Sequence, residues 1–144
     1  MNIDSIQNGY VLDHIKAGRS MDIYRYLNLN DLDCSVAIIK NVKSNKMGRK
    51  DIIKIDSLIA LDLTVLGYID PGITINVIRD GRLEEKQPLA LPHKIVNIIK
   101  CKNPRCITSI EQELPHIFVL ADEEKEIYRC KYCEEKASKS ASAW

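Results

Sequence analysis

The chain has 144 residues, of which 45% are hydrophobic and 28% charged, and its formal net charge is +1. This length suits one domain or two small ones, and the composition excludes collagen-like, mucin-like and disordered classes. No uncharged run approaches the roughly 20 residues of a membrane helix, and residues 1–4 lack the basic and apolar segments of a secretory signal. We therefore expect a cytoplasmic protein with no membrane or nucleic-acid partner. A net charge of +1 does not draw the chain to nucleic acid or to anionic lipid.

The composition changes at residues 87–92, where Pro88 and Pro92 stand four residues apart with no charge between them. Such a segment is typical of a stiff, extended connector. One of the five cysteines, Cys34, precedes it and four follow it. The sequence therefore predicts two domains, residues 1–92 and 93–144, with Cys34 as a buried small hydrophobe.

The first domain is predicted to alternate strands and helices. β-rich composition predicts five strands, at residues 9–15, 34–39, 50–56, 73–78 and 83–86. Apolar residues at helical spacing predict helices at residues 20–28, with Ser20 as the N-cap, and at residues 58–66. The order βαββαβ plus one strand is that of a ferredoxin-like sandwich of the α+β class.

Two connections in this domain have distinct compositions. Asp80 and Gly81 predict a tight hairpin turn. Residues 41–48 are polar and basic and are expected to form a loop. The cations in and beside that loop have the pattern of an ordinary solvated hairpin: Lys40, Lys43, Lys46, Arg49 and Lys50.

Four cysteines in the second domain share the spacing of a metal site: Cys101, Cys106, Cys130 and Cys133. Four residues separate the first pair and two the second, and Zn²⁺ favours such paired thiolates in a tetrahedron. Residues 117–120 and 127–128 are expected to form strands that join the pairs. Disulfides need an oxidising compartment and a redox pair needs a thioredoxin-like context, so neither is favoured. We expect a small all-β zinc-ribbon domain with one structural Zn²⁺ and no catalytic metal.

Other polar residues are ambiguous when read alone. Asp13 and His14 end a predicted strand, where such a pair is more often a cap or a surface pair than a site. Lys54 and Lys86 have the pattern of solvated strand residues. Neither Gly-rich phosphate-binding pattern, GxxxxGK[ST] or GxGxxG, occurs in the chain.

The βαββαβ domain, the proline-bounded connector and the cysteine ribbon together resemble the regulatory chain of aspartate carbamoyltransferase. The resemblance covers essentially the whole chain and is carried by residues 11–15, 47–55, 74–78, 101–107 and 130–134. The cysteine pairs alone are generic, whereas their combination with the Gly-Arg-Lys-Asp strand and the Asp-His strand is specific.

The resemblance implies a non-catalytic allosteric subunit of pyrimidine biosynthesis. Its first domain would bind ATP, CTP or UTP, and its zinc domain would dock on the catalytic chain. Regulatory homodimers would link catalytic trimers in a dodecameric holoenzyme. By motif match, Asp13 would hold the ribose hydroxyls, while Lys54 and Lys86 would face the nucleotide, with Lys86 nearest the phosphates. The remaining implied site residues line the site or contact the base or sugar: His14, Asn76, Ile78, Ile6 and Val11.

The alternative function from another class is a zinc-ribbon nucleic-acid-binding protein. The charge of the ribbon segment discriminates between the two functions, because binding to a phosphate backbone needs a basic surface. The segment between the cysteine pairs instead carries six acidic residues: Glu111, Glu113, Asp122, Glu123, Glu124 and Glu126. An independent enzyme is also disfavoured, since the three histidines are scattered and no catalytic set stands out.

Overall fold

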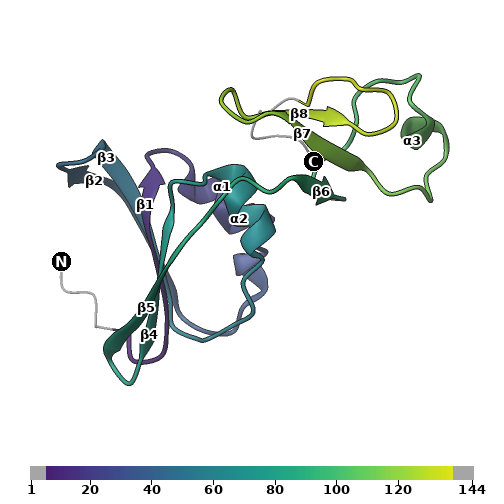
Figure 1. Ribbon diagram of the computed structural model, residues 1–144. Helices are drawn as coiled ribbons and strands as arrows, with labels where there is room; N and C mark the ends of the chain where they lie inside the picture. The colour runs from purple at the N-terminus through teal and green to yellow at the C-terminus, as the bar shows by residue number, and fades with distance from the viewer. Residues whose placement is uncertain (1–5, 138–144) are drawn as a thin grey trace. The chain divides into compact units, whose positions relative to one another are not determined.

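The computed structural model describes residues 6–137, so the N-terminal segment used above to predict location, residues 1–4, lies outside the described residues. The chain forms two compact units, Met1–Ala90 and Leu91–Trp144, which divide two residues before the boundary expected from composition (Figure 1). Among the described helices, none has the length and apolar character needed to cross a membrane.

The N-terminal unit is a five-stranded antiparallel sheet with helices on one face (Figure 1). Its strands are β1 (Gly9–Lys16), β2 (Val36–Ser44), β3 (Gly48–Ile55), β4 (Thr74–Arg79) and β5 (Arg82–Pro88). Its helices are α1 (Ser20–Tyr26), the short 3₁₀ helix η1 (Leu29–Asp31) and α2 (Leu63–Ile69). The strands lie in the order β2-β3-β1-β4-β5. The element order βαββαβ with one added strand confirms the predicted fold class.

The core of this unit fills the space between the sheet and its helices. Alternate strand residues such as Leu12, Ile53 and Ile75 are fully buried, and they pack with Ile23 of α1 and Leu66 of α2. Because successive strand residues point to opposite faces, the intervening residues lie on the side away from the helices. We call this side of the sheet the open face. Cys34 is half-buried against the same core, close to the predicted role.

The predicted helix at residues 58–66 was wrong at both ends, because α2 spans Leu63–Ile69. Helix α2 begins at Leu63 because the Asp62 side chain caps it, accepting hydrogen bonds from the Thr64 and Val65 amides at 3.1 and 3.2 Å. The apolar residues before the cap, including Leu58 and Ile59, pack against the core without forming a helix. Burial therefore accounts for their apolar character, and the carboxylate at position 62 sets the helix boundary.

The predicted N-cap at Ser20 and the predicted loop at residues 41–48 were also wrong, and Asp51 is part of the reason in both places. Arg19 occupies the N-cap position, and the Ser20 amide donates to Asp51 Oδ2 at 3.3 Å. The Asn41 amide donates to Asp51 Oδ1 at 3.0 Å. Pairing of β2 with β3 resumes beyond Asn41 and continues to the turn, so most of the expected loop is strand. Backbone pairing needs no apolar side chains, which is why composition missed it.

Each of the two strands that pair with β3 contains one β-bulge. In β1, Leu12 pairs with Ile53 and Ile15 pairs with Asp51, so one extra residue is accommodated and His14 takes a left-handed φ of 58°. The extra residue shifts the alternation by one position, so that Ile15 rather than His14 is buried in the core. In β2, a register shift between Ile39 and Val42 places Asn41 at a φ of 59°.

The predicted hairpin turn at Asp80 and Gly81 is confirmed. Arg79 pairs with Arg82 across a two-residue connection, and both turn residues have positive φ, 51° and 75°. Two positive φ angles define the tight hairpin turn whose twist matches that of the flanking strands. Strand β5 continues to Pro88, so the first residues of the expected connector belong to the sheet.

The C-terminal unit is a three-stranded antiparallel sheet with one short helix. Its elements are β6 (Lys94–Val96), α3 (Ile107–Ile110), β7 (Ile117–Asp122) and β8 (Ile127–Cys130), with the strands in the order β6-β7-β8. Both strands predicted between the cysteine pairs are present. The buried core is small, with Ile95, Phe118 and Tyr128 as its main large side chains.

Candidate functional site

The first candidate site is the group of four cysteines in the C-terminal unit, which two tight turns position. In the first turn, the Asn103 carbonyl accepts the Cys106 amide at 3.0 Å and the Asn103 side chain accepts the Arg105 amide at 3.0 Å. The second turn follows β8, where the Cys130 carbonyl accepts the Glu134 amide at 2.9 Å. Each turn therefore folds one cysteine pair back on itself.

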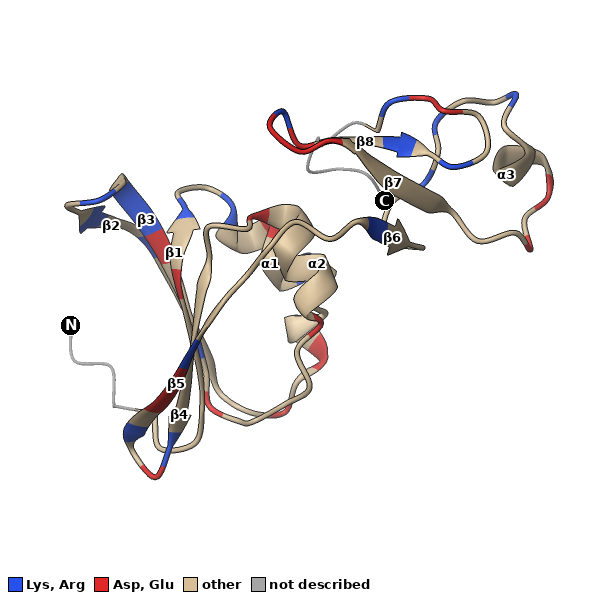
Figure 2. Cartoon of the chain, viewed as in Figure 1, with Lys and Arg blue, Asp and Glu red and all other residues tan. Residues whose placement is uncertain are grey.

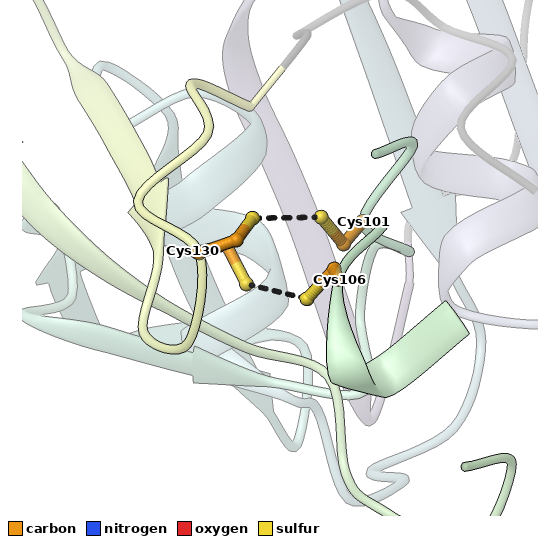
Figure 3. A group of neighbouring side chains, drawn as sticks. Cys101, Cys106 and Cys130 are labelled. Carbon is orange, nitrogen blue, oxygen red and sulfur yellow. Dashed lines mark hydrogen bonds between the residues drawn. The ribbon is translucent and has the colours of Figure 1, made fainter. Parts of the chain in front are cut away.

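The sulfur atoms of the four cysteines lie within 4.8 Å of one another. Cys101 Sγ is 3.5 Å from Cys133 Sγ, and Cys106 Sγ is 3.7 Å from Cys130 Sγ. Figure 3 shows the side chains of Cys101, Cys106 and Cys130 directed toward a common centre. Four thiolates around a tetrahedral Zn²⁺ at ~2.3 Å would stand about 3.8 Å apart. The spacing fits one structural zinc ion, and the role of these four cysteines as its ligands stays a prediction.

The thiols of this group have unequal acidities. Burial raises the pKa of Cys101 and of Cys130 above the ordinary value. Burial acts in the same direction on Cys106, but hydrogen bonds from Thr108 outweigh it and lower the pKa of Cys106 to about 7. Thr108 Oγ1 lies 3.1 Å from Cys106 Sγ. A metal must therefore displace protons from Cys101 and Cys130 as it binds, which couples metal binding to pH.

The second candidate site is a row of four residues across the open face of the N-terminal sheet. Lys54 on β3 pairs with Val11 on β1, and Val11 pairs with Asn76 on β4. Asn76 in turn pairs with Lys86 on β5. The Asn76 side chain donates to the Val11 carbonyl at 3.2 Å, which holds the centre of the row. Among the described residues, no ion pair engages the ammonium group of Lys54 or Lys86.

Asp13 lies one step along the open face from Val11 and is held firmly. Its Oδ1 accepts a hydrogen bond from the His14 amide at 2.6 Å. The same oxygen forms an ion pair with Lys50 Nζ at 2.9 Å. Partial burial alone would raise the pKa of Asp13, but Lys50 and the His14 amide outweigh it and hold the pKa below its ordinary value. His14 Nδ1 lies 3.2 Å from Thr74 Oγ1, so the imidazole is tied to β4.

The end of the open face nearest the β4–β5 turn is apolar. Ile78 pairs with Gly9 on one side and with Leu83 on the other, and the Leu83 side chain is 51% exposed. Ile6, three residues before β1 begins at Gly9, has a side-chain methyl group close to Gly9. The structure thus brings the charged and apolar residues named from the sequence onto one side of the sheet, and their role in ligand binding stays a prediction.

Sequence reasoning missed two residues of this face. Lys50 was read as part of a solvated loop, yet its side chain is only 16% exposed and pairs with Asp13. The sequence did contain a signal for the position of Lys50. Residues 50, 52 and 54 are every second residue of one strand, so Lys50 shares a face with Lys54. Leu83 was assigned only to a strand, and its proximity to Ile78 depends on the hairpin register.

Comparison with known protein families matches both units of the chain. Residues 1–90 match the model for the allosteric domain of the aspartate carbamoyltransferase regulatory chain. Residues 93–142 match the model for the metal-binding domain of the same chain. The second match covers all four cysteines of the candidate metal site.

Individual relatives match over nearly their full length. A chain from Clostridium tetani is 56% identical over 136 residues, which cover 94% of both chains. One from Clostridium acetobutylicum is 52% identical over 135 residues, covering 94% of this chain and 92% of the relative. One from Bifidobacterium longum is 42% identical over 137 residues, covering 95% and 99%. All three are named aspartate carbamoyltransferase regulatory chain. On its fold, its four-cysteine site and these similarities, the chain belongs to the family of aspartate carbamoyltransferase regulatory chains.

Proposed function

We propose that this chain is an allosteric subunit that binds nucleoside triphosphates on its open face and docks on the catalytic chain of aspartate carbamoyltransferase. ATP, CTP and UTP are the proposed effectors. Two regulatory chains would pair, and the pairs would link catalytic trimers into a dodecamer in the cytoplasm. Residues 1–92 would sense the nucleotide and residues 93–144 would dock.

The row from Lys54 to Lys86 is the observation that carries the nucleotide part of this proposal. A nucleoside triphosphate needs cations for its phosphates, an acceptor for its ribose hydroxyls and apolar surface for its base. Lys54 and Lys86 supply cations that no described acidic residue engages, Asp13 supplies the acceptor, and Ile78 with its neighbours supplies apolar surface. The absence of a Gly-rich phosphate loop agrees with binding without phosphoryl transfer.

Lys86→Ala is expected to weaken ATP binding far more than adenosine binding. The substitution removes a phosphate-facing cation, which is worth roughly 1.5–3 kcal/mol, or about ten- to hundredfold in affinity. Isothermal titration calorimetry at fixed salt measures both ligands. Lys46→Ala, at an exposed lysine of the β2–β3 turn, is the matched control and should leave both affinities unchanged. Equal losses for ATP and adenosine would place Lys86 away from the phosphates.

Exposed apolar residues beside the metal site support docking of the C-terminal unit on a protein partner. Ile107 directly follows Cys106 and is 43% exposed, and Ile110 at the other end of α3 is 64% exposed. Tyr132, between the last two cysteines, is 40% exposed. A large exposed apolar patch often marks a protein interface, and these three side chains are the ones proposed to form it. The metal would hold these side chains in place.

Ile110→Ser is expected to weaken assembly with the catalytic chain by roughly tenfold or more, since a buried interface side chain is often worth over 1 kcal/mol. Zinc content and nucleotide binding should not change, because Ile110 is neither a metal ligand nor part of the open face. Leu63→Ser, at a comparably exposed residue of α2, is the control. Sedimentation velocity with the catalytic chain measures assembly. Wild-type assembly of Ile110→Ser would exclude α3 from the interface.

The alternative of a nucleic-acid-binding ribbon is disfavoured by charge. The turn between β7 and β8 carries Glu123, Glu124 and Glu126, and Figure 2 shows this acidic cluster at the tip of the hairpin. A phosphate backbone would be repelled there. Filter binding with mixed DNA and RNA at moderate salt should detect no complex.

A further inference from the structure

Residues 6–8 form a short segment before β1 that holds the β4–β5 turn. The Gln7 carbonyl accepts a hydrogen bond from the Gly81 amide at 2.8 Å, and Asn8 Oδ1 accepts one from the Asp80 amide at 3.2 Å. Both turn residues have positive φ, so their amides are turned out of the sheet ladder. The backbone of Gln7 therefore has a fixed position relative to the turn.

The side chain of Gln7 lies where Gly81 has none. A Cβ built on Gly81 would stand 3.0 Å from Gln7 Oε1, so the amide packs directly against the glycine. Gln7 is exposed, and among the described residues no hydrogen bond uses its side-chain oxygen or nitrogen. A fixed backbone thus presents an amide group whose donor and acceptor are both available to a ligand.

This amide stands at the apolar end of the open face. The turn joins Ile78 to Leu83, and Ile78 pairs with Gly9, two residues after Gln7. Asp13 lies four residues after Gly9 along β1, a distance of about 13 Å at ~3.3 Å per residue. That span suits a nucleoside triphosphate lying along the strand, with its ribose hydroxyls at Asp13, its phosphates near the lysines and its flat base near Ile78. The polar edge of such a base would meet Gln7.

We propose that Gln7 is the residue that distinguishes one base from another in this site. An amide can accept from an exocyclic amino group and donate to a neighbouring ring nitrogen, as glutamine does with adenine. By rotating, it can also donate to the carbonyl of uracil. The inference rests on the nucleotide site proposed above and assigns its specificity to a side chain outside the sheet.

The test compares the dissociation constants of ATP, CTP and UTP for the wild-type chain, Gln7→Met and Gln7→Glu. The three ligands share ribose and triphosphate, so a general loss of structure changes all three constants by one factor. Gln7→Met removes both hydrogen-bonding atoms at similar size and should weaken binding five- to thirtyfold, unequally among the bases. Gln7→Glu accepts but does not donate, so it should shift the ratio of affinities at least fivefold in favour of ATP and CTP over UTP. Gln112→Met, at an exposed glutamine of the other unit, is the control.

Two results would overturn the assignment. If both Gln7 variants bind all three nucleotides as the wild type does, Gln7 does not contact the base, although the nucleotide site itself stands. If all three constants change by the same factor, Gln7 supports the structure of the turn and does not read the base. A wild-type chain that binds none of the three nucleotides would instead refute the proposed function, which keeps the two failures distinct.

Discussion

Cys106→Ser is expected to release the metal and unfold the C-terminal unit while leaving the N-terminal sheet intact. Cys106 is 1% exposed, and its sulfur lies 3.7 Å from that of Cys130. Structural zinc in small domains contributes roughly 10–16 kcal/mol of apparent binding free energy near pH 7. The unit has only a few large buried side chains besides its cysteines, so its own core cannot replace that contribution.

Zinc content per chain measures the release of the metal, and hydrogen exchange resolved by segment measures the unfolding of the C-terminal unit. Amides of β7 and β8 should lose protection, and amides of β1 and β3 should keep it, because the two units have separate cores. Cys34→Ser is the matched control, since Cys34 lies in the other unit and outside the metal group. A Cys106→Ser chain that retains one zinc ion and wild-type protection would contradict the four-cysteine site.

Asp51→Ala is expected to reduce the free energy of unfolding of the N-terminal unit by roughly 3–5 kcal/mol. The Asp51 carboxylate is fully buried and accepts the amides of Gly18, Ser20 and Asn41 at 3.0–3.3 Å. Its loss leaves three backbone donors without their acceptor at two places, the start of α1 and the bulge of β2. Hydrogen exchange of β1 and β3 amides measures the change. Asp56→Ala, at an exposed aspartate of the same segment, should change stability by less than about 0.5 kcal/mol.

The same carboxylate makes the unit sensitive to acid. Burial alone would raise the pKa of Asp51, but hydrogen bonds from Ser20, Asn41 and Gly18 outweigh it and hold the pKa below its ordinary value. A carboxyl with a lowered folded-state pKa stabilises fully above the unfolded-state pKa, about 3.9, and loses that contribution as pH falls through the folded-state value. Asp51→Asn should therefore show a smaller loss of stability than the wild type between pH 5 and pH 2 (roughly the span of such a titration). Equal acid sensitivity in both proteins would show that Asp51 is not the group responsible.

The sequence alone determined the features that depend on local pattern. β-rich composition located the strands, because β-branched and aromatic side chains pack well on a pleated, half-buried surface. Asp80 and Gly81 predicted their turn because few residues tolerate two successive positive φ angles. The spacing of Cys101, Cys106, Cys130 and Cys133 predicted a metal site because two short turns can direct four sulfurs at one ion.

The tertiary structure decided what depends on pairing between distant segments. Lys54, Val11, Asn76 and Lys86 share a row only because the register of four strands aligns them. Lys50 meets Asp13 through the same register, beside a bulge that no composition reveals. Asp51 replaces a local helix cap with a carboxylate 31 residues away in sequence. Strand register and buried hydrogen bonds are set by which segments come together, so a single sequence read along its length contains the residues of this face but not their arrangement.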